Sequence, residues 1–219
     1  MRLYVLCEGQ TEDRFVKEIL RPYLQNSDIF VTPIICETKR TVGKKYKGGV
    51  SKYRKIRDEL EILCKGDPTS FVTTMFDYYK LPLDTPGKST TGDIYKIVHG
   101  IETAIMTNLG GMRNLRINIT LHEFEGLLFS DVTAFRGVAN ADDNTVIELE
   151  RIKNCFPSPE HINDSEATAP SKRIVRLLPA YTKTFDGIEI AKRIGIAKMA
   201  EECWHFKTWI ESIKTWSYD

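Results

Sequence analysis

The stretch Leu3-Tyr4-Val5-Leu6-Cys7-Glu8-Gly9-Gln10-Thr11-Glu12 decides the fold class of this chain. Its first half, residues 3–7, is a short apolar run that is bounded by Glu8-Gly9 and predicts a buried β-strand. Thr11 is a candidate N-cap for the helix that follows. That helix is predicted up to about residue 25, because apolar side chains recur on one of its faces, at Phe15, Ile19, Leu20 and Leu24.

The alternation of strand and helix continues along the first two thirds of the chain. Further strands are predicted over residues 30–36, 71–76 and 115–121, and helices over residues 53–66 and 94–106. Strands that alternate with helices at this spacing form a parallel sheet with right-handed crossovers. We therefore expect a Rossmann-like α/β domain over residues 1–135, with a parallel sheet flanked by helices.

After residue 135 the sequence changes character. Residues 140–170 are acidic and contain Pro157, Pro159 and Pro170, which is typical of a loop-rich helical segment. Helical patterns follow from residue 171 onward, and we expect residues 136–219 to form a helical C-terminal extension that packs on the sheet. The spacing of its tryptophans favours helix packing or a partner surface over base stacking; they are Trp204, Trp209 and Trp216.

Composition excludes some classes of protein. The 219 residues carry 31 Lys and Arg against 30 Asp and Glu, a net charge of +1, which argues against a protein that coats polyanions. The N-terminal apolar run is too short for a signal peptide or a membrane span. The five cysteines contain no C-x-x-C pair, so we expect reduced thiols in a cytoplasmic protein without a membrane partner.

Acidic residues follow three of the predicted strands. Glu8 ends the first strand, Asp77 the third, and the segment His122-Glu123-Phe124-Glu125 the fourth. The carboxyl ends of parallel strands meet at one edge of the sheet, and carboxylates gathered there repel one another unless a cation or bound protons offset the repulsion. Hard oxygen ligands favour Mg²⁺ or Mn²⁺. The alternative is a set of helix caps and solvated loop residues.

Several motifs resemble a known family. The run Leu6-Cys7-Glu8-Gly9-Gln10-Thr11-Glu12 resembles the signature that opens TOPRIM domains, the module of topoisomerases, primases and OLD-type nucleases. More narrowly, the chain is similar over its whole length to a TOPRIM-like bacterial family named only as a domain of unknown function, whose members are often encoded beside ATPases in phage-defence loci. The segments that carry this similarity are residues 76–79, 122–129, 170–173 and 181–187.

The resemblance implies roles for individual residues. TOPRIM enzymes use the glutamate as acid or base and an Asp-x-Asp pair to hold Mg²⁺, which assigns these roles to Glu8 and Asp77. Tyr79 stands where the second aspartate would be, and a phenol is a poor neutral ligand near pH 7. We hypothesise that Glu123 or Glu125 supplies the lost carboxylate, with Glu123 as a metal ligand and Glu125 as a catalytic residue. His122 is a candidate to orient a water or protonate a leaving oxygen, or else it only forms a hydrogen bond at the strand end.

Cations gather in two places. Residues 38–57 hold nine Lys and Arg and no acid, and we expect a basic loop beside the acidic edge that follows a phosphate backbone through Lys39, Arg40, Lys44, Lys45 and Lys47. The alternative is a solvated basic face. Lys172, Arg173 and Lys183 form a second set that would clamp a phosphate or pair with the acidic residues 140–166.

Together these features predict a Mg²⁺- or Mn²⁺-dependent TOPRIM-like nuclease that cleaves DNA or RNA. The catalytic candidates are Glu8, Asp77, His122 and Glu125, and the metal candidates are Glu8, Asp77 and Glu123. The expected partners are nucleic acid and an ATPase, and a homo-oligomer is compatible with the sequence. The alternative is a non-catalytic module that binds nucleic acid or protein, which Tyr79 favours.

Overall fold

The computed structural model describes residues 1–36, 52–88, 91–163 and 166–216. Its centre is a sheet of five strands, and every pair of neighbouring strands is parallel. The strands are β1 (Arg2–Cys7), β2 (Phe30–Ile35), β3 (Phe71–Asp77), β4 (Leu115–Arg116) and β5 (Ile119–Thr120). Their order is β2-β1-β3-β4, and β5 also pairs with β3. The chain therefore has the expected Rossmann-like α/β architecture, with β1 and β3 adjacent at its middle.

The strand predicted over residues 115–121 is divided into β4 and β5. At the break, the buried hydroxyl of Thr74 on β3 donates to the backbone oxygen of Asn118 at 2.7 Å and accepts from its backbone nitrogen at 2.8 Å. A side chain thus takes the place of the backbone ladder at this point. The two short strands lie at the sheet edge.

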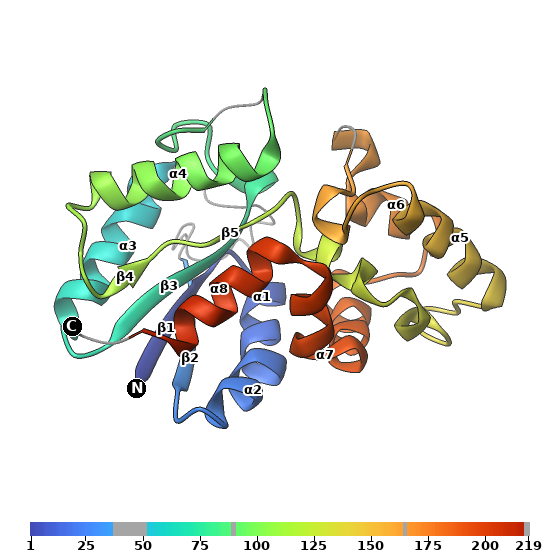
Figure 1. Ribbon diagram of the computed structural model, residues 1–219, viewed down its shortest axis with the longest axis horizontal. Helices are drawn as coiled ribbons and strands as arrows, with labels where there is room; N and C mark the ends of the chain where they lie inside the picture. Colours follow the sequence, from blue (N-terminus) through green and yellow to red (C-terminus); the bar gives the residue numbers. More distant parts are fainter. Residues whose placement is uncertain (37–51, 89–90, 164–165, 217–219) are drawn as a thin grey trace, which may run out of the picture.

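Helices cover both faces of the sheet (Figure 1). One face carries α3 (Tyr53–Gly66) and α4 (Ile94–Asn108), and the apolar cluster beneath them includes Leu6, Val72 and Phe76 of the strands. The other face buries Leu3, Val5 and Met75 under helices from both ends of the chain. Because strand side chains alternate between the two faces, the central strands β1 and β3 contribute to both clusters.

The helix after β1 is built from three pieces without an interruption of the chain: α1 (Gln10–Phe15), a π-helical turn (Val16–Leu20) and α2 (Arg21–Gln25). The prediction of Thr11 as its N-cap is wrong. Gly9 is the capping residue, with extended backbone and no side-chain cap, and Thr11 lies inside the first turn with its side chain buried.

The C-terminal part is mostly helical. Its longer helices are α5 (Asp143–Asn154), α6 (Pro170–Leu177), α7 (Ile188–Glu202) and α8 (Trp204–Lys214), and a π-helical turn spans Lys183–Gly187. Short 3₁₀ turns occur in this part at Pro159–His161 and Glu166–Thr168, and before it at Tyr78–Lys80, Phe124–Ser130 and Val132–Phe135. Residues such as Ile190, Trp209 and Ile213 share one apolar cluster with Leu3 and Val5 of β1. The C-terminal helices thus complete the core of the sheet, and the division at residue 135 stays a prediction. No helix in the described residues is long and apolar enough to span a membrane.

Candidate active site: a buried carboxylate–lysine cluster

Four carboxylates from separate elements meet near the carboxyl ends of β1 and β3. Glu8 follows β1 directly, Glu12 lies one turn further on in α1, Asp77 is the last residue of β3, and Glu125 lies in the 3₁₀ turn Phe124–Ser130. All four are buried, and Asp77 is 0% exposed. The parallel pairing of β1 with β3 brings the first and third of these residues to the same edge of the sheet.

Asp77 holds this arrangement together through its backbone and its side chain. Its backbone nitrogen donates to Glu8 Oε2 at 3.4 Å, and its Oδ1 accepts from the backbone nitrogen of Phe124 at 2.8 Å. Asp77 therefore ties the end of β1 to the turn that carries Glu125.

Two lysines lie among these acids. Lys183 Nζ is 3.0 Å from Asp77 Oδ2, 3.0 Å from Glu125 Oε2 and 3.6 Å from Glu12 Oε1. Lys80 Nζ is 3.3 Å from Glu8 Oε1 and 3.6 Å from Asp77 Oδ2. We call these six residues the carboxylate–lysine cluster: Glu8, Glu12, Asp77, Glu125, Lys80 and Lys183.

The cluster carries more negative than positive charge. Four carboxylates and two ammonium groups leave a formal charge of −2 when all are ionised. Burial, followed by repulsion from Asp77, raises the pKa of Glu8 to about 7, and burial raises the pKa of Glu125 to about 7 although Lys183 opposes it. Burial disfavours the charged form of Lys183, but Asp77, Glu125 and Glu12 outweigh it and its pKa lies well above the ordinary value. The cluster thus contains two carboxyl groups poised to exchange protons near neutral pH.

A cavity of about 450 Å³ opens beside the cluster. Its wall includes Lys80, Glu125 and Lys183 of the cluster together with Glu123, Lys172 and Tyr181. Glu123 Oε2 accepts from the backbone nitrogen of Ser171 at 3.1 Å, which fixes the start of α6 against this wall. The Tyr181 hydroxyl is buried and has no hydrogen-bond partner in the described part of the chain. The cavity therefore offers the cations Lys80 and Lys172 to an anionic ligand next to proton-exchanging acids.

The other sequence candidates are distributed as follows. His122 is buried with its backbone in the left-handed region (φ 59°), and its ring lies 5.4 Å from the ring of Tyr79. Burial, and then His161, lowers the pKa of His122 to about 4, so its imidazole is neutral at pH 7. Within the described residues no hydrogen bond or ion pair joins its side chain to the cluster, and its Nδ1 has no hydrogen-bond partner there.

The residues predicted to contact phosphate lie in different environments. Lys172 lines the cavity, whereas Arg173 donates to the backbone oxygen of Thr168 at 2.7 Å and stacks on Phe156, a structural position. Lys183 lies inside the cluster rather than on a separate clamp. Five further candidates fall outside the described residues: Lys39, Arg40, Lys44, Lys45 and Lys47.

The helix predicted over residues 53–66 is confirmed as α3, so the basic loop expected over residues 38–57 is wrong from residue 53 onward. Residues 53–57 belong to the first turns of α3, where Arg54 and Arg57 both form ion pairs with Asp58. The side chains of Tyr53 and Ile56 on the inner face of α3 are buried, and they hold this end of the segment against the core.

Sequence reasoning left Glu12 and Lys80 without a role. Each had a local signal: Glu12 follows Glu8 by one helical turn, and Lys80 follows Asp77 by three residues in a 3₁₀ turn.

The ligand chemistry of the cluster fits a hard divalent cation, because its carboxylates supply only oxygen donors and leave a net negative charge. Across the described residues, no group of three or more His, Cys, Asp and Glu is arranged to hold a metal ion. Mg²⁺ is often bound by only one or two carboxylates together with waters and substrate phosphates, and Glu8 and Asp77 are the two that would hold it here.

The fold and the cluster define a parallel α/β protein with a buried acidic site at the carboxyl edge of its sheet. The chain belongs to the family described as Domain of unknown function (DUF4276), whose model matches residues 7–214. No curated protein and no solved structure matches the chain.

Proposed function

We propose that this protein is a TOPRIM-like nuclease that depends on Mg²⁺ or Mn²⁺ and cleaves phosphodiester bonds in DNA or RNA. One observation carries the proposal: Glu8 and Asp77, at the ends of adjacent parallel strands, are joined by the hydrogen bond from the Asp77 backbone nitrogen to Glu8 Oε2. These are the two residues that the TOPRIM resemblance assigns to acid–base chemistry and to metal binding.

Glu8 and Asp77 are the residues that would hold the metal ion, with Glu123 or Glu125 as a further ligand. When bound, a divalent cation polarises the phosphoryl oxygen and lowers the pKa of a bound water. Glu8 is the candidate general base, since a pKa of about 7 lets it accept a proton near neutral pH. His122 is neutral at this pH and is therefore better suited to orient a water than to donate a proton.

Cations on the cavity wall would hold the phosphate. Lys172 lines the cavity and forms no ion pair among the described residues, and the side chain of Lys80 is 42% exposed even though it contacts Glu8. The basic residues between 39 and 47 would bind further phosphates along the nucleic-acid strand. We further propose an ATPase as partner protein and a role in phage defence; both follow from the TOPRIM-like resemblance alone.

The test is a digest of labelled DNA, RNA and tRNA by the full chain with Mg²⁺, Mn²⁺ or EDTA, with and without the proposed ATPase partner. We expect cleavage of at least one substrate that requires the divalent cation. If none is cut under any of these conditions while circular dichroism shows a folded protein, the proposed activity is wrong.

A second candidate is a binding module without catalysis. It is favoured by the position of Lys183, whose ammonium lies between Asp77 and Glu125, and by Tyr79 in place of the second aspartate. A crystal soaked in Mn²⁺ separates the two candidates. Anomalous density at Glu8 and Asp77 supports the nuclease, and nucleic-acid binding without such density supports the binding module.

A further inference from the structure

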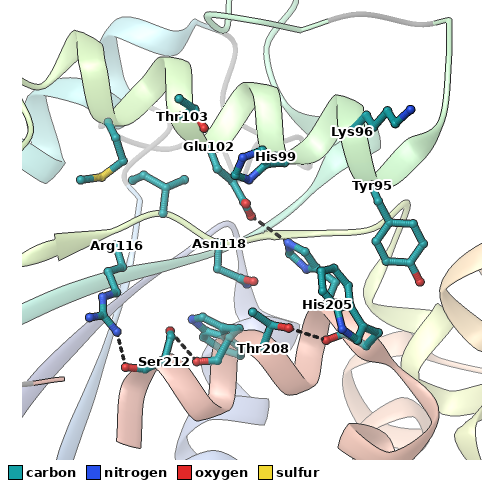
Figure 2. Close-up of a pocket in the computed structure, with 14 residues that line it drawn as sticks. Tyr95, Lys96, His99, Glu102, Thr103, Arg116, Asn118, His205, Thr208 and Ser212 are labelled. Carbon is teal, nitrogen blue, oxygen red and sulfur yellow. Dashed lines mark hydrogen bonds and ion pairs between the residues drawn. The ribbon is translucent and has the colours of Figure 1, made fainter. Parts of the chain in front are cut away.

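A second and larger pocket lies away from the cluster. It has a volume of about 580 Å³ and is bounded by α4, by the end of β4 with the break that follows it at Ile117 and Asn118, and by α8 (Figure 2). It shares no lining residue with the cavity beside the cluster. Its volume is typical of sites for small organic ligands.

One wall of this pocket is aromatic. Trp204, the first residue of α8, is 63% exposed, which is unusual for so large an apolar side chain. Its ring meets Tyr95 edge to face at 5.7 Å between centroids, and the Tyr95 hydroxyl is fixed by Glu160 Oε2 at 2.8 Å. A held aromatic pair at the mouth of a pocket gives a flat ligand a surface on which to stack.

Several polar side chains inside the pocket donate hydrogen bonds to the protein itself. His205 Nε2 donates to Glu102 Oε1 at 3.0 Å, and Asn118 Nδ2 donates to the backbone oxygen of Thr74 at 3.3 Å. The hydroxyls of Thr208 and Ser212 donate to backbone oxygens within α8. Figure 2 shows the Asn118 side chain in the space between α4 and α8, while Lys96 extends outward from α4.

Acceptors remain. Asn118 Oδ1 and Glu102 Oε2 have no hydrogen-bond partner among the residues that the structure describes. Asn118 is also held through its backbone nitrogen by Thr74, and Glu102 Oε1 accepts from the backbone nitrogen of Ile119, so both acceptors are fixed in place. A ligand that fits here is flat, apolar on its faces, and carries N–H donors on its edge.

We propose that this pocket binds a nucleobase with an exocyclic amino group, as in adenine, cytosine or guanine. The base stacks on Trp204 and donates from its amino edge to Asn118 Oδ1 and Glu102 Oε2. A purely aliphatic ligand would bury these two acceptors without partners, which costs free energy. The inference is independent of the proposed nuclease, because binding of the base requires neither the metal nor the cluster.

The test is calorimetric titration of the full chain, in EDTA, with cytidine and with its 4-deamino analogue, which lacks only the amino group. The same titration is made with guanosine and inosine, which differ only in the 2-amino group. We expect each amino-bearing nucleoside to bind about tenfold more tightly than its partner, since the partner leaves an acceptor unpaired. Equal affinities within both pairs, or no binding by any nucleoside at millimolar concentration, would overturn the proposal.

Variants locate the binding. Trp204→Ala removes an exposed ring and should weaken cytidine binding about tenfold, while Leu83→Ala, at an apolar residue that is 90% exposed elsewhere, should leave it unchanged. Unchanged affinity in Trp204→Ala would contradict the assignment. A short single-stranded oligonucleotide, compared with the free nucleosides, shows whether the base comes from a free nucleotide or from a strand.

Discussion

The ammonium of Lys183 lies 3.0 Å from the carboxylate of Asp77, although 106 positions separate the two residues in the chain. This contact joins the end of the central strand β3 to the π-helical turn before α7. Lys183 also contacts Glu125 and Glu12, so three buried acids share one cation. Removal of a single partner from such a buried network leaves uncompensated charge, which is strongly destabilising.

Lys183→Met should therefore lower the free energy of unfolding by about 2–5 kcal/mol. The loss should be larger at pH 8 than at pH 5, because the surrounding carboxyl groups are more fully ionised at the higher pH. Urea denaturation followed by circular dichroism measures it. Lys198→Met, which removes surface ion pairs with Glu201 and Glu202, is the matched control and should cost much less stability. Equal losses in the two variants would contradict the role assigned to Lys183.

Glu8 makes stability depend on pH. Its pKa is about 7 in the folded protein against an ordinary value of 4.5, so the folded state binds more protons than the unfolded chain between these two pH values. The stability that Glu8 contributes is complete below the lower value and is lost as the pH rises through the higher one.

The variant Glu8→Gln lacks this titration. Relative to wild type, it should gain about 1–3 kcal/mol in unfolding free energy between pH 5 and pH 8. Urea titrations at pH 5, 6, 7 and 8 measure the difference, with Glu148→Gln at the surface as control. A difference that stays constant over this range would show that the Glu8 pKa is not raised.

Thr74 determines where the edge strand breaks. Thr74→Val keeps the side-chain shape but leaves the backbone nitrogen and oxygen of Asn118 without their buried partner, which should cost about 2–4 kcal/mol. The control Thr32→Val, on the exposed side of β2, should change stability by less than about 0.5 kcal/mol. A similar small effect at both positions would mean that the break has another cause.

The two acids of the 122–125 segment should differ as metal ligands. Glu125 lies in the cluster, whereas Glu123 is engaged by the backbone nitrogen of Ser171. We expect Glu125→Gln to weaken Mn²⁺ binding about 10–100-fold in calorimetry and Glu123→Gln to weaken it less. If both variants keep wild-type affinity, neither glutamate replaces the aspartate that Tyr79 displaces.

The sequence was sufficient for the order of strands and helices in the parallel sheet and for three acids of the cluster, Glu8, Asp77 and Glu125. Strand ends are readable from short apolar runs, and parallel strands bring their carboxyl ends together, so Glu8 and Asp77 could be predicted as neighbours. The ion pairs of Lys183 could not be predicted, because no periodicity connects residues so far apart. The N-cap prediction for Thr11 was wrong because a buried threonine and a capping threonine cannot be told apart in sequence. The break at Asn118 could not be predicted because it depends on a tertiary contact from Thr74.

The central claim is that the cluster cleaves phosphodiester bonds with a divalent cation. The most direct measurement compares single-turnover cleavage of a labelled substrate in Mn²⁺ by wild type, Asp77→Asn and Arg173→Gln. Arg173→Gln is the control, because Arg173 lies in α6 and donates to the backbone oxygen of Thr168 rather than lining the cavity. We predict that Asp77→Asn slows cleavage at least about 100-fold, while Arg173→Gln stays within about threefold of wild type. Cleavage by Asp77→Asn at the wild-type rate would contradict the claim.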